Sequence, residues 1–259
     1  MLPALPARAE VLDVPLAVSN YAEVIDWMAA LIEADGRAYV TAAAVNLVMS
    51  AREDPEACAA LLGATLAVPD GQPLVWALHA LGHPAATRIY GPDLMAHFCA
   101  HAAQRGTPMY LYGGRTPEAL ALLQQRLEQR FPGIRIVGGY SPPFRALSAE
   151  EEAHLVAEID GSGAQVVWVG TGQPKQEKWM LAMRPRLAAP LLVGVGAAFD
   201  FHAGLVSQAP AWMGRNGLEW LYRLSREPRR LWPRYVRYNP RFIVGFLGQY
   251  RAHRRNKRS

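Results

Sequence analysis

Short apolar runs alternate with longer amphipathic stretches through most of the chain. Apolar runs of four to eight residues indicate buried strands, and apolar positions that recur every three or four residues indicate helices. We predict strands at 11–18, 38–41, 65–68, 109–112, 134–137, 166–169 and 191–195. We predict helices at 20–33, 45–52, from 55, 72–81, 93–104, 117–130, 148–159 and from 174. This alternation predicts an α/β fold, a largely parallel, Rossmann-like sheet core flanked by helices.

The alternation stops after Pro210. Residues 211–259 have no strand pattern, and their aromatic and arginine side chains are interleaved in a helical pattern. We therefore divide the chain into an α/β core, residues 1–210, and a helical Arg/aromatic-rich C-terminal appendage, residues 211–259.

The charge of the chain is concentrated in that appendage. The net charge is +5, but residues 223–259 hold 12 of the 27 basic residues and one of the 22 acidic ones. Such a segment binds polyanions. It could lie in a membrane interface with arginines on lipid phosphates, bind single-stranded RNA, or pack on the core with a solvated basic face. We favour an anionic membrane surface.

Composition narrows the class of protein. A hydrophobic content of 51% argues against disorder. The two cysteines, Cys58 and Cys99, lack metal-ligand spacing, which indicates a reduced, cytoplasmic protein. No apolar run reaches the roughly 18 residues of a membrane span, and the N-terminal residues lack the apolar core of a signal peptide.

Several polar residues follow predicted strands. Ligands of open α/β sheets bind beyond the carboxyl ends of the strands, so these residues are candidates for one shared site. They are Thr41, Asp70, Gly139, Tyr140, Gln176 and Asp200. Each also has a local explanation, because Asp-Gly is a common turn pair and Thr or Asp can cap the next helix.

Other chemistries have weaker support. The chain has no GxGxxG, no GxxxxGK[ST] and no GxSxG motif. It also has no DxD motif, and His97 and His101 share a helix face without a third metal ligand nearby. We therefore predict no metal site and no cofactor.

An ordered set of motifs resembles the WecG/TagA/CpsF family of bacterial glycosyltransferases, over about residues 11–240. The motifs are Thr41, Pro69-Asp70-Gly71, Arg88-x-x-Gly91-x-Asp93, Gly113-Gly114, Gly139-Tyr140, Gly172-x-Pro174-Lys175-Gln176-Glu177, Gly194-Val195-Gly196 with Asp200, Leu218-Glu219-Trp220-Leu221-Tyr222-Arg223-Leu224 and Glu227-Pro228-x-Arg230.

The resemblance implies inverting transfer of a sugar from a UDP-sugar to a polyprenyl-diphosphate-linked saccharide, in the synthesis of exopolysaccharide, capsule or a teichoic acid-like polymer. The sugar would be N-acetylmannosamine, its uronic acid or another hexose. It also implies a peripheral membrane protein on the cytoplasmic face, with no nucleic-acid partner. The alternative is an RNA-binding or RNA-modifying protein that uses the basic appendage. The sequence leaves a homo-oligomer open.

The resemblance also assigns roles to residues. Asp70 matches the candidate general base, and Thr41 its neighbour at the reacting sugar. Positions of the nucleotide-sugar pocket are matched by Arg88, Gly139, Tyr140, Gln176 and Asp200. Arginines of the appendage that would face the diphosphate are matched by Arg223, Arg230 and Arg234.

One position departs from the family pattern. Many members carry Asn two residues after the Thr, where this chain has Ala43. The nearest asparagine is Asn46, about one helical turn further on. Either Asn46 replaces the missing side chain or the donor sugar differs.

An inverting transfer needs one carboxylate as base and a stabilised leaving group. Asp70 is the best-placed carboxylate. Because no DxD motif can hold a metal, we expect arginines and the helix start at Lys175-Gln176 to stabilise the departing UDP without a metal.

Overall fold

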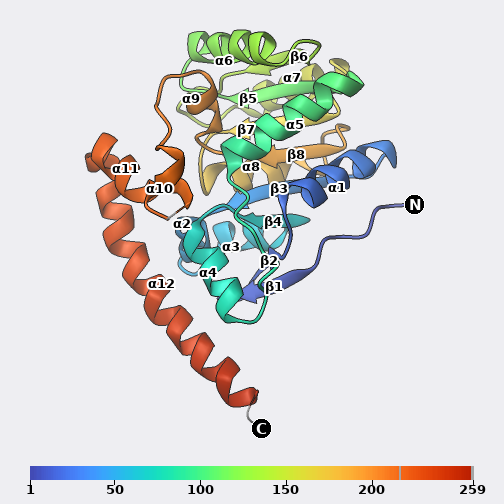
Figure 1. Ribbon diagram of the computed structural model, residues 1–259. Coiled ribbons are helices and arrows are strands. Elements are labelled where there is room, and N and C mark those ends of the chain that lie inside the picture. The colour runs from blue at the N-terminus through green and yellow to red at the C-terminus, as the bar shows by residue number, and fades with distance from the viewer. Residues whose placement is uncertain (216, 258–259) are drawn as a thin grey trace.

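The computed structural model describes residues 1–215 and 217–257, without the side chains of Ala211, Arg215 and Arg230. Its strands form one sheet in the order β1-β2-β4-β3-β8-β7-β5-β6 (Figure 1). The strands are β1 (Arg8–Val11), β2 (Val14–Ala17), β3 (Ala38–Ala43), β4 (Leu66–Pro69), β5 (Pro108–Gly113), β6 (Arg135–Tyr140), β7 (Val166–Gly170) and β8 (Leu191–Gly194). All pairs except β1–β2 are parallel, which confirms the predicted sheet.

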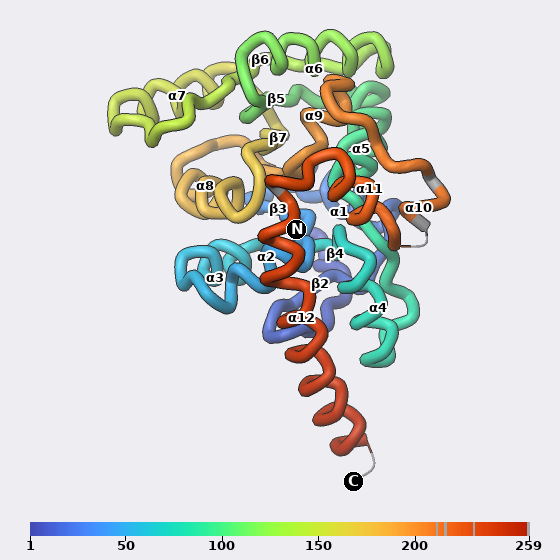
Figure 2. Tube along the Cα trace, turned by 90° about the vertical axis from the view of Figure 1, so that its left-hand side faces the viewer, coloured from blue at the N-terminus to red at the C-terminus, as the bar shows by residue number. Residues whose placement is uncertain are grey.

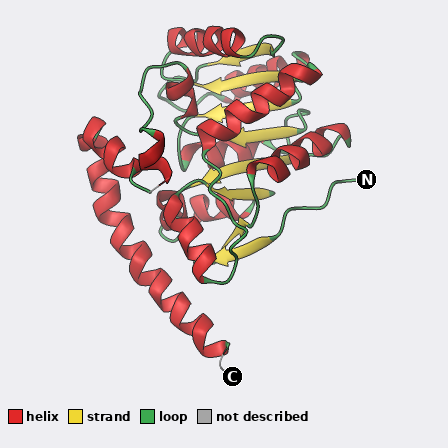
Figure 3. Cartoon of the chain, in the orientation of Figure 1, coloured by secondary structure: helices red, strands yellow, loops and turns green. Residues whose placement is uncertain are grey.

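Helices cover both faces of this sheet (Figure 3). They are α1 (Tyr21–Glu33), α2 (Val45–Ala51), α3 (Pro55–Leu62), α4 (Gln72–Ala80), α5 (Gly91–Arg105), α6 (Pro117–Arg130), α7 (Ala149–Gly161), α8 (Lys175–Met183), α9 (Ala198–His202), α10 (Ala211–Arg215), α11 (Glu219–Arg226) and α12 (Pro228–Asn256). Their starts follow local signals. Asn20 caps α1, and Ser148 with Glu151 forms a capping box at the start of α7.

Alternate residues of the central strands serve two separate cores. Val40, Trp168 and Val193 are buried against α1, α5, α6 and α9. Their neighbours Val167 and Leu192 are buried on the opposite face, against α7 and α8. Because successive side chains of a strand point to opposite faces, a continuous apolar run gives a sheet that is covered on both sides.

The central strands β3 and β8 form a topological switch point. They are parallel neighbours, but α9 packs on one face of the sheet, while α2 packs with Ala43 on the other. Helices that leave adjacent strands toward opposite faces open a crevice beyond the strand ends. The parallel strands point toward the side where α10 and α11 lie (Figure 3).

The predicted single strand at 11–18 is wrong. Residues 8–17 form the β1–β2 hairpin, with Leu12 and Asp13 at positive φ in its turn. The apolar alternation runs through this turn, and no glycine marks it. Left-handed backbone is uncommon for leucine, so the sequence carries no clear turn signal there.

The long helix α12 lies along one side of the core, and its C-terminal end extends past it (Figures 1 and 2). Phe242, Phe246 and Tyr250 pack into the core built from the β1–β2 hairpin, α2 and α4. The side chain of Gln249 accepts a hydrogen bond from the Leu12 N–H at 2.9 Å and donates one to the Glu10 carbonyl at 2.8 Å. Among the described residues, no helix is long and apolar enough to cross a bilayer.

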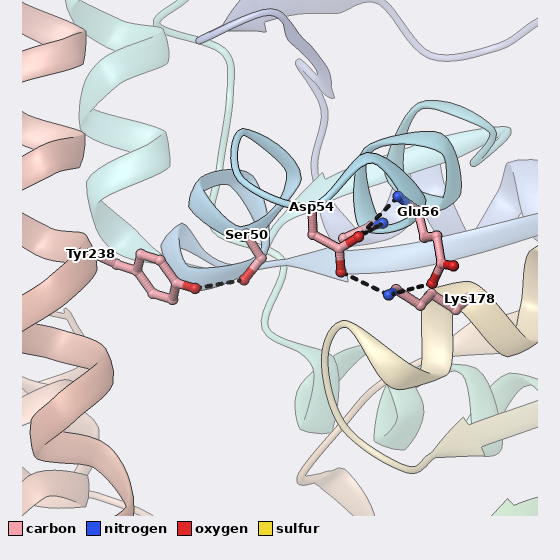
Figure 4. A network of polar contacts seen from close by, with 6 residues as sticks. Ser50, Asp54, Glu56, Lys178 and Tyr238 are labelled. Atoms are coloured by element: carbon pink, nitrogen blue, oxygen red, sulfur yellow. Dashed lines mark hydrogen bonds and ion pairs between the residues drawn. The ribbon is translucent and has the colours of Figure 1, made fainter. Parts of the chain in front are cut away.

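The α2–α3 segment links α12 to α8 through polar contacts (Figure 4). The Ser50 hydroxyl donates to the Tyr238 hydroxyl of α12 at 3.4 Å. The Lys178 ammonium of α8 lies 2.7 Å from Asp54 and 2.9 Å from Glu56, at the start of α3. These contacts hold α12 and α8 on either side of one small helical unit.

Candidate active site

Three cavities lie around the end of β4. The strand-end cavity, about 140 Å³, lies between the ends of β3, β7 and β8 on one side and Arg223, Arg234 and Tyr235 on the other. The α4–α12 cavity, about 660 Å³, runs between those two helices. The Arg88 cavity, about 610 Å³, is bordered by Tyr21, Asp93 and Gln208.

Asp70 lies at the junction of the strand-end cavity and the α4–α12 cavity, and Asn46 borders both as well. The Asp70 N–H donates to the Ala43 carbonyl at 2.8 Å, which fixes the turn after β4. The Oδ1 atom accepts from the Gly91 N–H at 2.8 Å, at the first residue of α5. No described residue donates to Oδ2, so this oxygen is available to a ligand.

The environment of Asp70 favours a proton acceptor. Burial raises the pKa of Asp70 to about 6, although the Arg88 cation and the Gly91 N–H oppose that rise. A carboxylate in this range is ionised near neutral pH and remains more basic than a solvated aspartate.

A largely buried ion pair joins the core to the appendage beside Asp70. The Arg88 Nε donates to the Asp70 carbonyl at 2.6 Å, and its Nη2 lies 2.6 Å from Glu219 Oε2. The two side chains are 19% and 13% exposed. The i,i+4 spacing of Glu219 and Arg223 on the helix would also allow these two side chains to pair. A buried, hydrogen-bonded contact to Arg88 is stronger than an exposed i,i+4 pair.

Two appendage arginines face the cavities. Arg223 and Arg234 border both the strand-end cavity and the α4–α12 cavity. Neither side chain forms a hydrogen bond or an ion pair with another described side chain, and the Arg223 guanidinium lies 5.9 Å from the Phe201 ring. Both cations are therefore available to an anionic ligand. Arg230 belongs to α12, but its predicted contact to the diphosphate lies outside the described side chains.

Thr41 and Gln176 lie beneath the cavity rather than on its wall. Both are fully buried, as is Glu177. Glu177 Oε1 accepts from the Thr41 hydroxyl at 2.7 Å and from Gln176 Nε2 at 2.8 Å. Gln176 Oε1 in turn accepts from the N–H of Gly196 at 3.0 Å, and Gly196 borders the strand-end cavity. Thr41 and Gln176 thus shape the cavity floor.

Glu177 is the member of this network that the sequence analysis did not select. Burial raises its pKa, and its Oε2 atom is buried without a hydrogen-bond partner among the described residues. The residue follows Gln176 in the first turn of α8, where an acidic side chain is commonly solvated or interacts with the helix dipole. Only the packing of α8 against β3 distinguishes it, and the local sequence does not show that contact.

The remaining predicted residues lie apart from Asp70. The Tyr140 ring stacks on Tyr112 with centroids 6.2 Å apart, and neither Gly139 nor Tyr140 borders any of the three cavities. Asp200 accepts two hydrogen bonds from Arg115, at 3.0 and 2.9 Å. The structure therefore gathers Asn46, Asp70, Arg88, Arg223 and Arg234, and leaves Gly139, Tyr140 and Asp200 toward the β5–β6 side.

The histidine pair on α5 has packing partners. The His97 ring lies 5.0 Å from the Tyr21 ring, and His101 lies 5.8 Å from Phe98. Within the described residues, no three His, Cys, Asp or Glu side chains are grouped so that they could hold a metal ion.

The chain matches a known family over nearly its whole length. The Glycosyl transferase WecG/TagA/CpsF family matches residues 9–256, which include all three cavities. The chain therefore belongs to this family, and it is a glycosyltransferase of cell-surface polysaccharide biosynthesis.

Proposed function

We propose that this glycosyltransferase moves a hexose from a UDP-sugar to a polyprenyl-diphosphate-linked saccharide, with inversion, and that Asp70 is the general base. The observation that carries the proposal is the position of Asp70 between two cavities of different character. A base for such a transfer must reach the acceptor hydroxyl while the donor carbon lies within bonding distance of that hydroxyl. The position of Asp70 on the border of both cavities supports this role.

The strand-end cavity is the proposed site of the reacting donor sugar. It lies at the switch point between β3 and β8, where open α/β sheets bind their ligands. Gly172 and Gly196 border this cavity. Because glycine has no side chain, the backbone at these positions can approach a ligand closely. Asn46 and Asp70 border the same cavity, which supports Asn46 as the replacement for the family asparagine that is absent at Ala43.

The reaction itself is a single displacement. The Asp70 carboxylate takes the proton of the acceptor hydroxyl, whose oxygen attacks the anomeric carbon from the face opposite UDP. The bond from that carbon to the diphosphate oxygen breaks, and the electron pair leaves with UDP. The negative charge that develops on UDP is stabilised by fixed cations, for which Arg223 and Arg234 are the candidates.

The appendage is the proposed contact with an anionic membrane surface on the cytoplasmic side. Trp232, Val236 and Val244 of α12 are 60%, 52% and 71% exposed. Exposed apolar side chains between arginines are typical of helices that lie in a membrane interface. This contact would bring the site to an acceptor that is anchored in lipid.

The decisive experiment is a screen of UDP-sugars against a short polyprenyl-diphosphate saccharide, with product detected by mass spectrometry. We expect one UDP-hexose to give a product with an inverted anomeric centre. UDP should also raise the thermal unfolding temperature. Transfer with retention, or no UDP-dependent shift together with tight, steeply salt-dependent RNA binding, would overturn the proposal.

A further inference from the structure

The two ends of the α4–α12 cavity differ in chemistry. Near β4 its wall is polar and holds Asp70, Arg223 and Arg234. Farther along, the wall is made of apolar side chains from two helices. These are Trp76 and Ala80 on α4, and Phe242, Ile243, Phe246 and Leu247 on α12.

At the apolar end of the cavity, several large apolar side chains are exposed to solvent. Phe242 is 5% exposed and belongs to the core. By contrast, Trp76, Ile243 and Leu247 are 53%, 57% and 45% exposed, although all three line the cavity. Exposed apolar side chains gathered on both walls of one groove indicate a ligand with an apolar part.

The order of these groups along the cavity restricts the ligand. Asp70 and two cations that have no ion-pair partner among the described side chains lie at one end, and the apolar groove lies beyond them along α12. A molecule that fits this order has a hydroxyl-bearing head, then an anionic linker, then a hydrocarbon chain. The charge of the linker would match Arg223 and Arg234, and the groove is continuous with both.

We propose that the groove between α4 and α12 binds the first isoprene units of the polyprenyl chain of the acceptor. The inference rests on the proposed function, because it takes the diphosphate-linked acceptor as its starting point. It adds that the protein itself holds the lipid chain, with the acceptor diphosphate at Arg223 and Arg234. Because these arginines border both cavities, they would be shared by that diphosphate and the diphosphate of UDP. Each isoprene unit that the groove buries should then increase the affinity for the acceptor. In a protein that contacts only the bilayer surface, the length of the chain would not change the affinity.

The test uses ligands whose head is constant and whose chain grows. Inorganic diphosphate and dimethylallyl, geranyl and farnesyl diphosphate are titrated by calorimetry into the whole chain, without vesicles and below the micelle concentration. We expect affinity to rise by roughly tenfold for each isoprene unit, since burial of apolar groups is favourable. Arg223→Gln should weaken every member of the series, inorganic diphosphate included.

Variants of the groove separate its role from general apolar adhesion. Leu247→Ser should remove most of the gain with chain length and leave the affinity for inorganic diphosphate unchanged. Leu62→Ser is the matched control, because Leu62 is 49% exposed on α3 and borders none of the three cavities. Ala80→Trp, at an exposed position of the groove wall, should block the chain without a change in the core.

The outcomes are distinct. An affinity that does not rise with chain length, or that falls equally in Leu62→Ser and Leu247→Ser, overturns the groove and leaves the transferase proposal standing. A dimer that Leu247→Ser dissociates, with no change in the gain per unit, makes the groove an interface between copies and also overturns the inference. If no member binds, inorganic diphosphate included, both the groove and the diphosphate-linked acceptor are wrong.

Discussion

The replacement Asp70→Asn tests the base most directly. Asparagine keeps an oxygen that can accept from the Gly91 N–H, so the start of α5 should be retained. It cannot accept the proton of the acceptor hydroxyl. Removal of a general base typically costs ~10²–10⁴-fold in rate. We therefore expect kcat to fall by about that factor, while the dissociation constant of UDP changes little.

The pH dependence of the unmodified protein gives an independent measure of the same group. The pKa of Asp70 is raised to about 6, and only the ionised carboxylate acts as a base. Rates should therefore fall as the pH falls through about 6. At pH 5 about one tenth of the carboxylate would be ionised, against about nine tenths at pH 7, so kcat/KM should drop by close to tenfold.

Arg88 supplies a control on this assignment. Its cation lowers the pKa of Asp70 against the effect of burial. Arg88→Gln should therefore move the acidic limb of the pH profile of kcat/KM to higher pH. This shift is expected independently of any change in the maximal rate. The assay is UDP release at constant ionic strength between pH 4.5 and 8.5. An Asp70→Asn variant within about threefold of the parent, or an acidic limb that Arg88→Gln leaves in place, would refute the reasoning.

Three further predictions follow from the same contacts. In a chain ending at Ala209, turnover should be almost absent, because Arg223 and Arg234 border the proposed donor site; retained UDP-sugar turnover in a folded truncated chain would remove the appendage from the reaction. EDTA should leave activity largely intact, since arginines are the proposed charge stabilisers, and a strict requirement for Mg²⁺ or Mn²⁺ would contradict this. Burial raises the pKa of Glu177 in the folded state above its value in the unfolded chain. The folded state is therefore most stable at a pH below the unfolded pKa and loses stability as the pH rises through the folded pKa, where the buried side chain must ionise. Glu177→Gln should raise the unfolding temperature more at pH 8 than at pH 5, and an equal change at both would argue against this account.

The sequence predicted the elements of the core well where local chemistry specifies them. The helix at 117–130 was predicted with its observed bounds, because Thr116 caps it and Pro117 occupies its first turn. The hairpin at 8–17 was missed for the opposite reason, since its turn has Leu12 and Asp13 where a glycine would be expected.

The candidate site was predicted less completely, because its key contacts join distant segments. Asp70 could be selected from its place after a strand. Its burial, its bond to Gly91 and the pairing of Arg88 with Glu219 all depend on how three separate segments pack. Gln176 was predicted to line the pocket, and the structure buries it beneath Gly196 instead. This burial follows from the packing of α8, which the local sequence does not encode.

The boundary between core and appendage, placed at residue 210 from the sequence, is not a boundary of the site. Each of the three cavities has walls from both sides of that residue. Arg88 makes the two parts interdependent, since one guanidinium binds the Asp70 carbonyl in the core and the Glu219 carboxylate in the appendage. Undocking of α11 would leave this buried cation without its carboxylate, which is costly, and would open both cavities at Asp70 to water. Any contact that holds α11 and α12 in place, the proposed lipid chain between α4 and α12 included, should therefore also stabilise the proposed geometry in which Asp70 meets donor and acceptor.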